Sequence, residues 1–208
     1  MDITDPKIDQ YLEDLLPARD KVLEEMEDYA AERDIPIIGP VVGRFLFQLV
    51  RLVKAKTIFE MGSAIGYSTI WIARAAGEGA TVYYTDGDPE KAKRATKYIE
   101  RAGVRDRVRI LTGDALELFD QTPGTFDIVF CDVDKEGYPE AFRKAVPRIR
   151  KGGLLLADNV LWHGRVVEPP QEAATRGILE FNRLIYASPD LFPTILPVRD
   201  GFAVCEKL

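Results

Sequence analysis

The chain has 208 residues, of which 46% are hydrophobic and 30% are charged, and its formal net charge is −6. This composition excludes a disordered chain, and no run approaches the roughly 18 apolar residues that a membrane-spanning helix needs. The acidic balance disfavours nucleic acid as a partner, since proteins that bind its backbone usually present a basic face.

The length indicates a single domain, residues 1–208, with a sizeable core. The first residues lack a signal-peptide pattern, so we expect a cytoplasmic protein without a membrane partner. The chain has one histidine, His163, and two cysteines, none in a metal-ligand cluster. Zinc chemistry and disulfides are therefore not expected.

The beginning of the chain has helical spacing. Residues 6–33 are rich in Leu, Glu and Lys and are interrupted at Pro17, which predicts two helices. Residues 35–40 are interpreted as an apolar linker, and residues 41–54 have the spacing of a third helix. We expect residues 1–54 to form a helical cap on a core made by residues 55–208.

Short β-branched runs alternate with helical stretches after residue 57. The pattern predicts a mostly parallel sheet covered by helices on both faces, with ligands at the carboxyl ends of its strands. Two final apolar runs flank an Asp-Gly turn, so one of the last strands must be antiparallel. The predicted strands are residues 57–61, 81–85, 108–112, 126–131, 153–157, 194–198 and 202–206. The predicted helices are residues 67–76, 89–102, 115–119, 139–150 and 173–187.

A glycine turn follows the first predicted strand. Gly62 and Gly66 are four residues apart, so the Gly-x-Gly-x-x-Gly pattern of dinucleotide-binding proteins is absent. Glu60 precedes the turn, and its carboxylate would repel a pyrophosphate but could hold an ammonium group. S-adenosylmethionine has an ammonium group and no phosphate, which favours it as the ligand. Alternatively, the two glycines simply connect a strand to a helix.

Acidic residues also end the second and third predicted strands. Asp86 is placed where a ribose diol is bound in nucleotide folds, and Asp88-Pro89 is a typical helix start. We assign Asp86 to the ribose and Asp88 to the helix cap. Asp114 could accept a hydrogen bond from an adenine amino group, or it could cap the short helix that follows.

The fourth and fifth predicted strands end in Asp132-x-Asp134-Lys135 and Asp158-Asn159. Adjacent strands lie about 4.8 Å apart, so these oxygen-bearing side chains could converge. Carboxylates and a carboxamide favour a hard cation, Mg²⁺ or alternatively Ca²⁺ or Mn²⁺. Spacing alone does not choose between Asp132 and Asp134. The competing interpretation is that these residues only form a loop turn and a helix cap.

The order of these motifs resembles the cation-dependent O-methyltransferases of the catechol and caffeoyl-CoA type, which are class I S-adenosylmethionine-dependent enzymes. The resemblance extends over most of the chain, from Ile37 to Lys207. The matching motifs are Glu60-x-Gly62-x-x-x-Gly66-Tyr67-Ser68, Asp86-x-Asp88-Pro89, Gly113-Asp114-Ala115, Asp132-x-Asp134-Lys135-x-x-Tyr138, Asp158-Asn159-x-x-Trp162 and Pro197-x-x-Asp200-Gly201.

The resemblance implies a Rossmann-like sheet of seven strands, a homodimer, and specific site residues. Lys135 matches the catalytic lysine, and Lys135, Tyr138 and Trp162 match substrate positions. The implied Mg²⁺ ligands are Asp132, Asp158 and Asn159. The implied S-adenosylmethionine-binding residues are Ile38, Glu60, Gly62, Ala64, Ser68, Asp86, Gly113, Asp114, Ala115 and Asp132. The N-terminal helices would serve dimerisation or cover the acceptor site, and His163 receives no catalytic role.

The implied reaction suits a small catechol-like phenol. A phenol has a pKa near 10 and is a poor nucleophile at neutral pH, but two adjacent hydroxyls can chelate one cation. Lys135 could then accept the proton, and the oxygen would attack the sulfonium methyl in line. The alternatives are a nicotinamide-dependent oxidoreductase, which tight NADH binding would support, and a methyltransferase-like binding protein without turnover.

Overall fold

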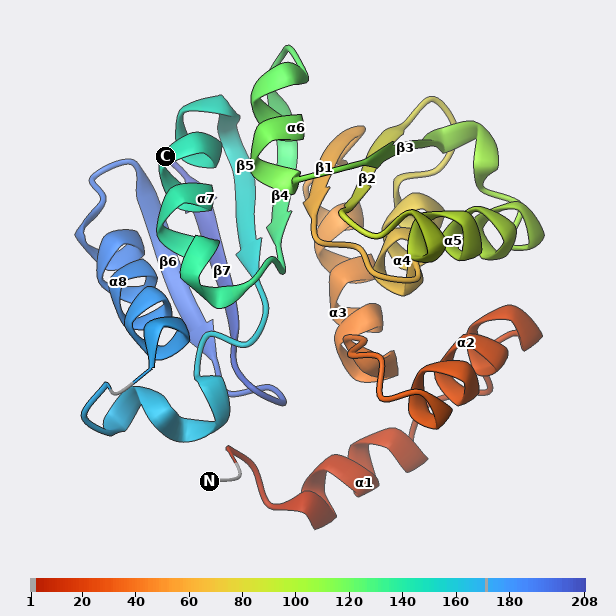
Figure 1. Cartoon of the computed structure of the whole chain (residues 1–208), viewed down its shortest axis with the longest axis horizontal. Helices are drawn as coiled ribbons and strands as arrows, with labels where there is room; N and C mark the ends of the chain where they lie inside the picture. The colour runs from red at the N-terminus through yellow and green to blue at the C-terminus, as the bar shows by residue number, and fades with distance from the viewer. Residues whose placement is uncertain (1–2, 171) are drawn as a thin grey trace.

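A computed structural model describes residues 3–170 and 172–208, and seven strands form one sheet in it. The strands are β1 (Thr57–Met61), β2 (Thr81–Asp86), β3 (Val108–Thr112), β4 (Phe126–Cys131), β5 (Ile149–Ala157), β6 (Leu191–Leu196) and β7 (Phe202–Lys207). Their order is β3-β2-β1-β4-β5-β7-β6 (Figure 1). The first five pair in parallel, and β7 is antiparallel to β5 and β6. The predicted α/β, Rossmann-like sheet with an antiparallel last strand is confirmed.

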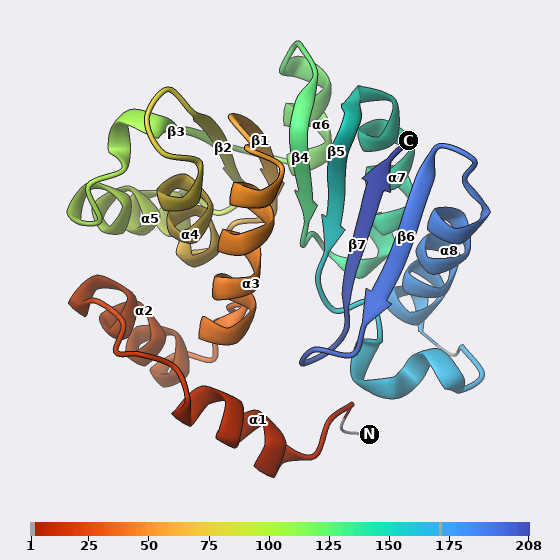
Figure 2. The same cartoon turned by 180° about the vertical axis from the view of Figure 1, so that it is seen from behind.

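Alternate residues of the central strands enter two separate cores. One core receives Ile58 and Ile128, and the other receives Phe59 and Val129. The second core lies between the sheet and the helices that stand behind it in Figure 2. The helices of the first core are α2 (Lys21–Glu32), α3 (Gly39–Leu52), α4 (Tyr67–Ala76) and α5 (Pro89–Arg101), and those of the second are α6 (Ala115–Gln121), α7 (Tyr138–Ala145) and α8 (Ala173–Ala187). Burial on both faces explains why the strands have near-continuous apolar runs.

Acidic side chains begin the helices that follow β2 and β3. The Asp88 carboxylate accepts a hydrogen bond of 2.8 Å from the Glu90 amide, and Pro89 stands in the first turn of α5. This confirms the predicted helix start, because a proline there loses no helical hydrogen bond. Such caps depend on a few neighbouring residues, which is why the sequence located these helices.

The N-terminal region contains three helices, as predicted, and α1 (Pro6–Asp14) ends before Pro17. One boundary is corrected: α3 begins at Gly39, inside the segment expected to be a linker. Pro40 lies in the first turn of α3, where its missing N–H has no cost. No residue of α1 is buried, whereas α2 buries Leu23, Met26 and Ala30 in the first core. No helix in the described ranges is long and apolar enough to cross a membrane.

The single helix predicted over residues 139–150 is wrong at its end. Helix α7 stops at Ala145, a short 3₁₀ turn follows, and β5 begins at Ile149. Pro147 cannot donate to a continuing helix, and the Arg148 guanidinium donates to the Phe119 carbonyl oxygen at 2.6 Å. From Ile149 onward the chain pairs with β4 as a strand and no longer continues the helix.

The predicted strand over residues 194–198 is also shifted, since β6 runs from Leu191 to Leu196. Pro193 lies inside it, although proline usually argues against a strand. The sheet tolerates this residue because β6 is an edge strand that pairs only with β7.

Candidate active site

A cavity of about 1010 Å³ opens at the carboxyl ends of the parallel strands. Figure 1 shows β4 and β5 pointing toward the edge of the sheet where α1, α2 and the segment before α8 gather. The residues at or directly after the ends of all five parallel strands line this cavity: Gly62, Asp86, Gly113, Asp132 and Asp158. The sequence prediction that these strand ends face one site therefore agrees with the geometry.

The glycine turn after β1 is held close to the neighbouring strands. A Cβ on Gly62 would lie 2.3 Å from the backbone oxygen of Asp132, and Gly62 has a φ of +84°. The Tyr84 hydroxyl donates to the Ala64 carbonyl oxygen at 2.6 Å, and the Ser63 amide donates to the Thr85 carbonyl oxygen at 2.8 Å. The turn needs glycine because any side chain would collide with the chain after β4.

Glu60 lies behind this turn. Its side chain is fully buried, it is not among the residues lining the cavity, and its carboxylate accepts a hydrogen bond from the Thr69 hydroxyl. Burial raises the pKa of the Glu60 carboxyl to about 7, although hydrogen bonds from Ser68, Thr69 and Ser63 oppose the shift. In this structure Glu60 is enclosed, and it does not present its carboxylate to a ligand in the cavity.

Ser68, Ile38 and Tyr138 are likewise buried and outside the cavity lining. Ser68 contacts Glu60, and Ile38 precedes α3 while its neighbour Ile37 lines the cavity. The geometry therefore places these predicted contact residues one layer behind the wall. They can support a ligand site without touching the ligand in this arrangement.

The acidic residues after β2 and β3 do line the cavity. The Asp86 carboxylate accepts a hydrogen bond from the Asp88 amide at 2.8 Å. Asp114 Oδ1 accepts from the amides of Leu116 and Glu117, both at 2.9 Å, so the capping alternative for Asp114 is present in the structure. Capping and ligand binding remain compatible, because these hydrogen bonds use one carboxylate oxygen and Asp114 and Ala115 both face the cavity.

Lys135 is held by polar partners at the end of β4. It belongs to the 3₁₀ turn η2 (Lys135–Gly137), and its side chain is 10% exposed. Its Nζ atom lies 2.9 Å from Asp132 Oδ1 and 2.9 Å from the Tyr138 hydroxyl, which donates to the Asp158 carbonyl oxygen at 2.8 Å. Tyr138 therefore positions Lys135 and connects the turns after β4 and β5. Trp162 lies nearby, with Nζ 5.9 Å from its ring centre.

Asp158 lacks a complete set of partners. It is 2% exposed, and within the described residues its Oδ1 atom has no hydrogen-bond partner. Burial, and then the negative charge of Asp132, raise the pKa of the Asp158 carboxyl to about 7. Two nearby carboxylates and an orphaned oxygen are an arrangement that a cation would stabilise.

Among the residues that the structure describes, no three His, Cys, Asp or Glu side chains group closely enough to hold a metal ion by themselves. The predicted ligand set has only two such residues, Asp132 and Asp158, with the Asn159 amide as its third donor. Asn159 lines the cavity and has a φ of +57°, a conformation that asparagine tolerates well. The oxygen donors fit a hard cation chemically, and the ion itself belongs to the proposal below.

Several cavity-lining residues were not predicted as site residues. The N-terminal part contributes Glu27, whose carboxylate accepts a hydrogen bond of 2.6 Å from the Tyr67 hydroxyl, and the segment that contains Asp34. The C-terminal part contributes His163, Arg199 and Asp200. The sequence marked Asp200 as a hairpin residue and as part of a matching motif, without a role in the site, and no local pattern marks Glu27.

Comparison with known proteins places these features in context. The O-methyltransferase family model matches residues 16–208. The catechol O-methyltransferase of Niastella koreensis is 39% identical over 196 residues, which cover 91% of this chain and 89% of that protein. Caffeoyl-CoA O-methyltransferase 1 of Arabidopsis thaliana is 30% identical over 207 residues, covering 92% of this chain and 80% of that protein.

Solved structures agree with these sequence matches. The O-methyltransferase from Bacillus cereus in complex with SAH has a TM-score of 0.89 and 34% identity, covering 97% of each chain. The O-methyltransferase TomG from Streptomyces achromogenes, solved with SAM, has a TM-score of 0.89 and 29% identity, covering 97% of this chain and 96% of that one.

Proposed function

This chain belongs to the O-methyltransferase family, and on that premise we propose that it methylates a hydroxyl of small catechol-like phenols with the help of a divalent cation. It is an S-adenosylmethionine-dependent O-methyltransferase of the catechol and caffeoyl-CoA type. The cation and the phenolic acceptor are the proposed parts. The observation that supports them is the convergence of Asp132, Lys135, Asp158 and Asn159 on the cavity that the glycine turn also lines.

The turns after β1, β2 and β3 are the proposed binding site for S-adenosylmethionine. Gly62 and Ala64 allow the ligand to approach the backbone, Asp86 would bind the ribose diol, and Gly113 to Ala115 would face the adenine. The predicted contacts of Ile38, Glu60 and Ser68 are proposed as indirect support, since all three lie behind the wall. We also propose a single domain with a helical cap at residues 1–54 and a core at residues 55–208, which the presence of Glu27, Asp34 and Ile37 in the cavity lining supports.

Asp132, Asp158 and Asn159 are proposed to hold the divalent cation, Mg²⁺ or alternatively Ca²⁺ or Mn²⁺. When bound, S-adenosylmethionine supplies the methyl group and the cation supplies positive charge that favours loss of the acceptor hydroxyl proton. Asp132 is also a predicted contact for the methyl donor, and it borders both parts of the cavity through Gly62 and Lys135. The orphaned Oδ1 atom of Asp158 supports this assignment.

Lys135 is the proposed proton acceptor. A neutral amine keeps two hydrogen atoms, and the two nearest acceptors for them are Asp132 Oδ1 and the Tyr138 oxygen, both at 2.9 Å, while the Val133 carbonyl oxygen lies farther away at 3.4 Å. The remaining lone pair can then face the acceptor hydroxyl, which is the requirement for general-base catalysis. Trp162 would form an aromatic wall for the phenol ring, and Tyr138 would act through Lys135.

Calorimetric titration tests the proposal in two steps. S-adenosylhomocysteine is added first, and 4-methylcatechol is then added with and without Mg²⁺. We expect S-adenosylhomocysteine, the product of the methyl donor, to bind. We then expect 4-methylcatechol to bind only when Mg²⁺ is present. Product binding without any effect of Mg²⁺ on catechol binding would contradict the metal site. Methyl transfer to the catechol, measured by mass spectrometry, separates an active enzyme from the alternative of a binding protein without turnover.

The nicotinamide-dependent alternative is not supported. The family match and the absence of the Gly-x-Gly-x-x-Gly pattern both favour S-adenosylmethionine. A titration with NADH under the same conditions is the direct check, and we expect no saturable binding. The acidic composition supports the absence of a nucleic-acid partner and is compatible with the proposed cytoplasmic location, which cell fractionation would test.

A homodimer is proposed through α1. Ile8, Tyr11, Leu12 and Leu15 follow helical spacing, and they are 51%, 60%, 39% and 62% exposed. Such an apolar stripe on a helix without buried residues favours association with a second copy. Light scattering should give the mass of a dimer, and replacing Tyr11 and Leu15 with serine should shift it to a monomer. A monomeric unmodified chain would contradict this part.

A further inference from the structure

The charges that line the cavity are strongly unequal. Nine Asp or Glu side chains line it, against three Lys or Arg side chains and His163, and one of the nine, Glu27, is paired with Arg19 outside the lining. The net positive charges of a sulfonium methyl donor and a divalent cation would offset only part of this excess. An acceptor therefore enters a cavity that remains negative, and this bears on which acceptors bind.

Two of the cationic side chains already have partners. Lys135 is paired with Asp132, and the Arg199 guanidinium donates to the Ile37 carbonyl oxygen at 3.1 Å. The third, Lys91, stands in the first turn of α5 near the proposed ribose site. Arg199 and Lys91 keep their positive charge, so a carboxylate or phosphate on the acceptor would meet these two cations in a lining that is rich in carboxylates.

Three of the carboxylates lie outside the proposed donor and cation sites and are exposed. Asp34 follows α2, and Asp134 and Glu136 flank Lys135. Within the described residues none of the three forms an ion pair. Their exposed carboxylates therefore add negative charge to the cavity lining without forming ion pairs.

Asp200 provides an independent observation at the same end of the cavity. It is 9% exposed, its Oδ1 atom accepts a hydrogen bond from the His163 amide, and within the described residues its Oδ2 atom accepts none. Oδ2 lies 3.7 Å from His163 Nδ1, a pairing that is ionic only if the imidazole is protonated. A buried carboxylate oxygen without a donor favours a ligand group that donates or carries positive charge.

We propose that the acceptor is a catechol whose side chain is neutral or cationic, and that Asp200, with Asp34, Asp134 and Glu136, rejects acceptors bearing carboxylate or phosphate groups. This inference rests on the proposed function and narrows its substrate class. It separates the two kinds of relative, because a coenzyme A thioester carries several phosphate charges and a simple catechol carries none.

Matched acceptors test the inference in the enzyme supplied with S-adenosylmethionine and Mg²⁺. The probes are 4-(2-aminoethyl)catechol, 4-ethylcatechol, 3-(3,4-dihydroxyphenyl)propanoate and the coenzyme A thioester of caffeate. We expect kcat/KM for the cationic catechol to exceed that for the propanoate by about tenfold or more at low salt, and the ratio to shrink at about 1 M salt. Calorimetric dissociation constants with S-adenosylhomocysteine should follow the same order.

The outcomes distinguish the two levels of the proposal. Methylation of none of the four compounds would overturn the proposed function. Methylation with equal or better kcat/KM for the propanoate or the thioester would overturn the charge inference and leave the proposed function standing.

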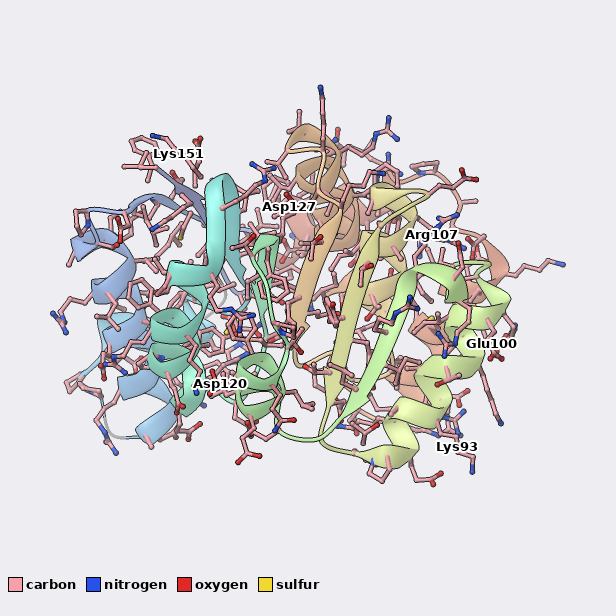
Figure 3. All side chains as sticks on the ribbon, turned by 90° about the horizontal axis from the view of Figure 1, so that it is seen from above. Lys93, Glu100, Arg107, Asp120, Asp127 and Lys151 are labelled. Atoms are coloured by element: carbon pink, nitrogen blue, oxygen red, sulfur yellow. The ribbon has the colours of Figure 1, made fainter. Side chains whose placement is uncertain are left out.

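Substitutions of carboxylates test which of them cause the preference for the cationic catechol. Asp200→Asn keeps an oxygen for the His163 amide and removes the negative charge, so the preference for the cationic over the anionic catechol should narrow by at least about threefold. The double variant Asp34→Asn with Glu136→Gln changes exposed residues only and should narrow it as well, even if Asp200→Asn fails to fold. Glu100→Gln on the outer side of α5 is the control for net charge (Figure 3), and it should leave the preference unchanged. An unchanged preference in the double variant would also overturn the inference.

Discussion

The cavity has two walls that satisfy their polar groups in different ways. The glycine wall consists of the turns after β1, β2 and β3, where Asp114 Oδ1 and the Ala64 carbonyl oxygen have partners within the wall itself. The charged wall consists of the turns after β4 and β5 and the turn between β6 and β7. There Asp158 Oδ1 and Asp200 Oδ2 are buried without hydrogen bonds from the described residues.

This difference separates what the chain completes by itself from what a ligand completes. Turns that are closed by their own hydrogen bonds can hold backbone atoms ready for a ligand at little cost. Buried carboxylates with missing partners are unfavourable until a cation or donor arrives. We therefore expect changes in the glycine wall to affect stability and donor binding, and changes in the charged wall to affect the reaction.

The largest expected effect comes from the charged wall. Lys135→Met should lower kcat about 10²–10⁴-fold, because it removes the proposed proton acceptor. Calorimetric affinity for S-adenosylhomocysteine should stay within about twofold, because the glycine wall is untouched. Lys151→Met, near the start of β5 and far from the cavity, is the matched control (Figure 3). Equal activity in the two variants would remove Lys135 from the mechanism.

The next largest effect is a loss of stability where the glycine wall, at Gly62, packs against the charged wall, at Asp132. Gly62→Ala should lower the free energy of unfolding by about 3–5 kcal/mol, because it adds backbone strain and a contact of 2.3 Å with the Asp132 oxygen. Gly79→Ala has a similar φ of +74° and meets nothing within 4 Å, so it should lose only about 1 kcal/mol. Urea denaturation measures both. Equal losses would mean that strain, and not contact, decides the effect.

Glu60 lies behind the glycine wall and carries a buried carboxyl group. Its raised pKa predicts that the stability of the protein depends on pH. Because its carboxyl pKa rises from 4.5 to about 7 in the folded chain, the folded state holds the proton more tightly than the unfolded chain. Its contribution to stability is therefore fully present below pH 4.5 and is lost as the pH rises to about 7. The free energy of unfolding that is lost between these two pH values amounts to about 3 kcal/mol.

Glu60→Gln should remove that part of the pH dependence. Denaturation of ligand-free protein at pH 5 and at pH 8 should show a smaller difference in the variant than in the unmodified chain. The slope that Asp158 contributes in the same direction would remain. Identical slopes in both proteins would show that Glu60 does not titrate in this range.

The smallest expected effect is a gain in stability from the charged wall. Asp158→Asn removes a buried charge that lacks a partner, so the ligand-free, metal-free chain should become about 1–2 kcal/mol more stable. If Asp158 holds the cation as proposed, Mg²⁺ should raise the melting temperature of the unmodified protein and should not raise that of the variant. A variant that Mg²⁺ still stabilises would contradict the role of Asp158 in cation binding.

Much of the fold followed from local patterns. The bounds predicted for β1, β3, β4, α4 and α8 match the structure, because β-branched runs, caps and helical spacing act over a few residues. The end of α7 was misjudged because Arg148 and Arg150 are compatible with the last turn of a helix, while the pairing of Ile149 with β4 depends on a distant strand. Pro147 was the local signal that should have ended the helix.

For the candidate site, the sequence and the resemblance supplied the strand-end residues, and the structure gathers these around one cavity. They did not supply Glu27 or Asp34, whose approach to that cavity depends on how α2 packs on the core. They also did not show that Glu60, Ser68 and Tyr138 lie behind the wall, because burial depends on every element that surrounds a residue.

The sequence by itself thus determined the order of strands and helices, the family, and which acidic residues end which strands. Each of these depends on periodicity and on motifs within short stretches of chain. Only the tertiary structure decided which carboxylates face the cavity, which are enclosed, and which lack partners. These properties arise from contacts between segments that are far apart in the sequence, and the loss of water in those contacts sets both the pKa of Glu60 and the unmet hydrogen bonding of Asp158 and Asp200.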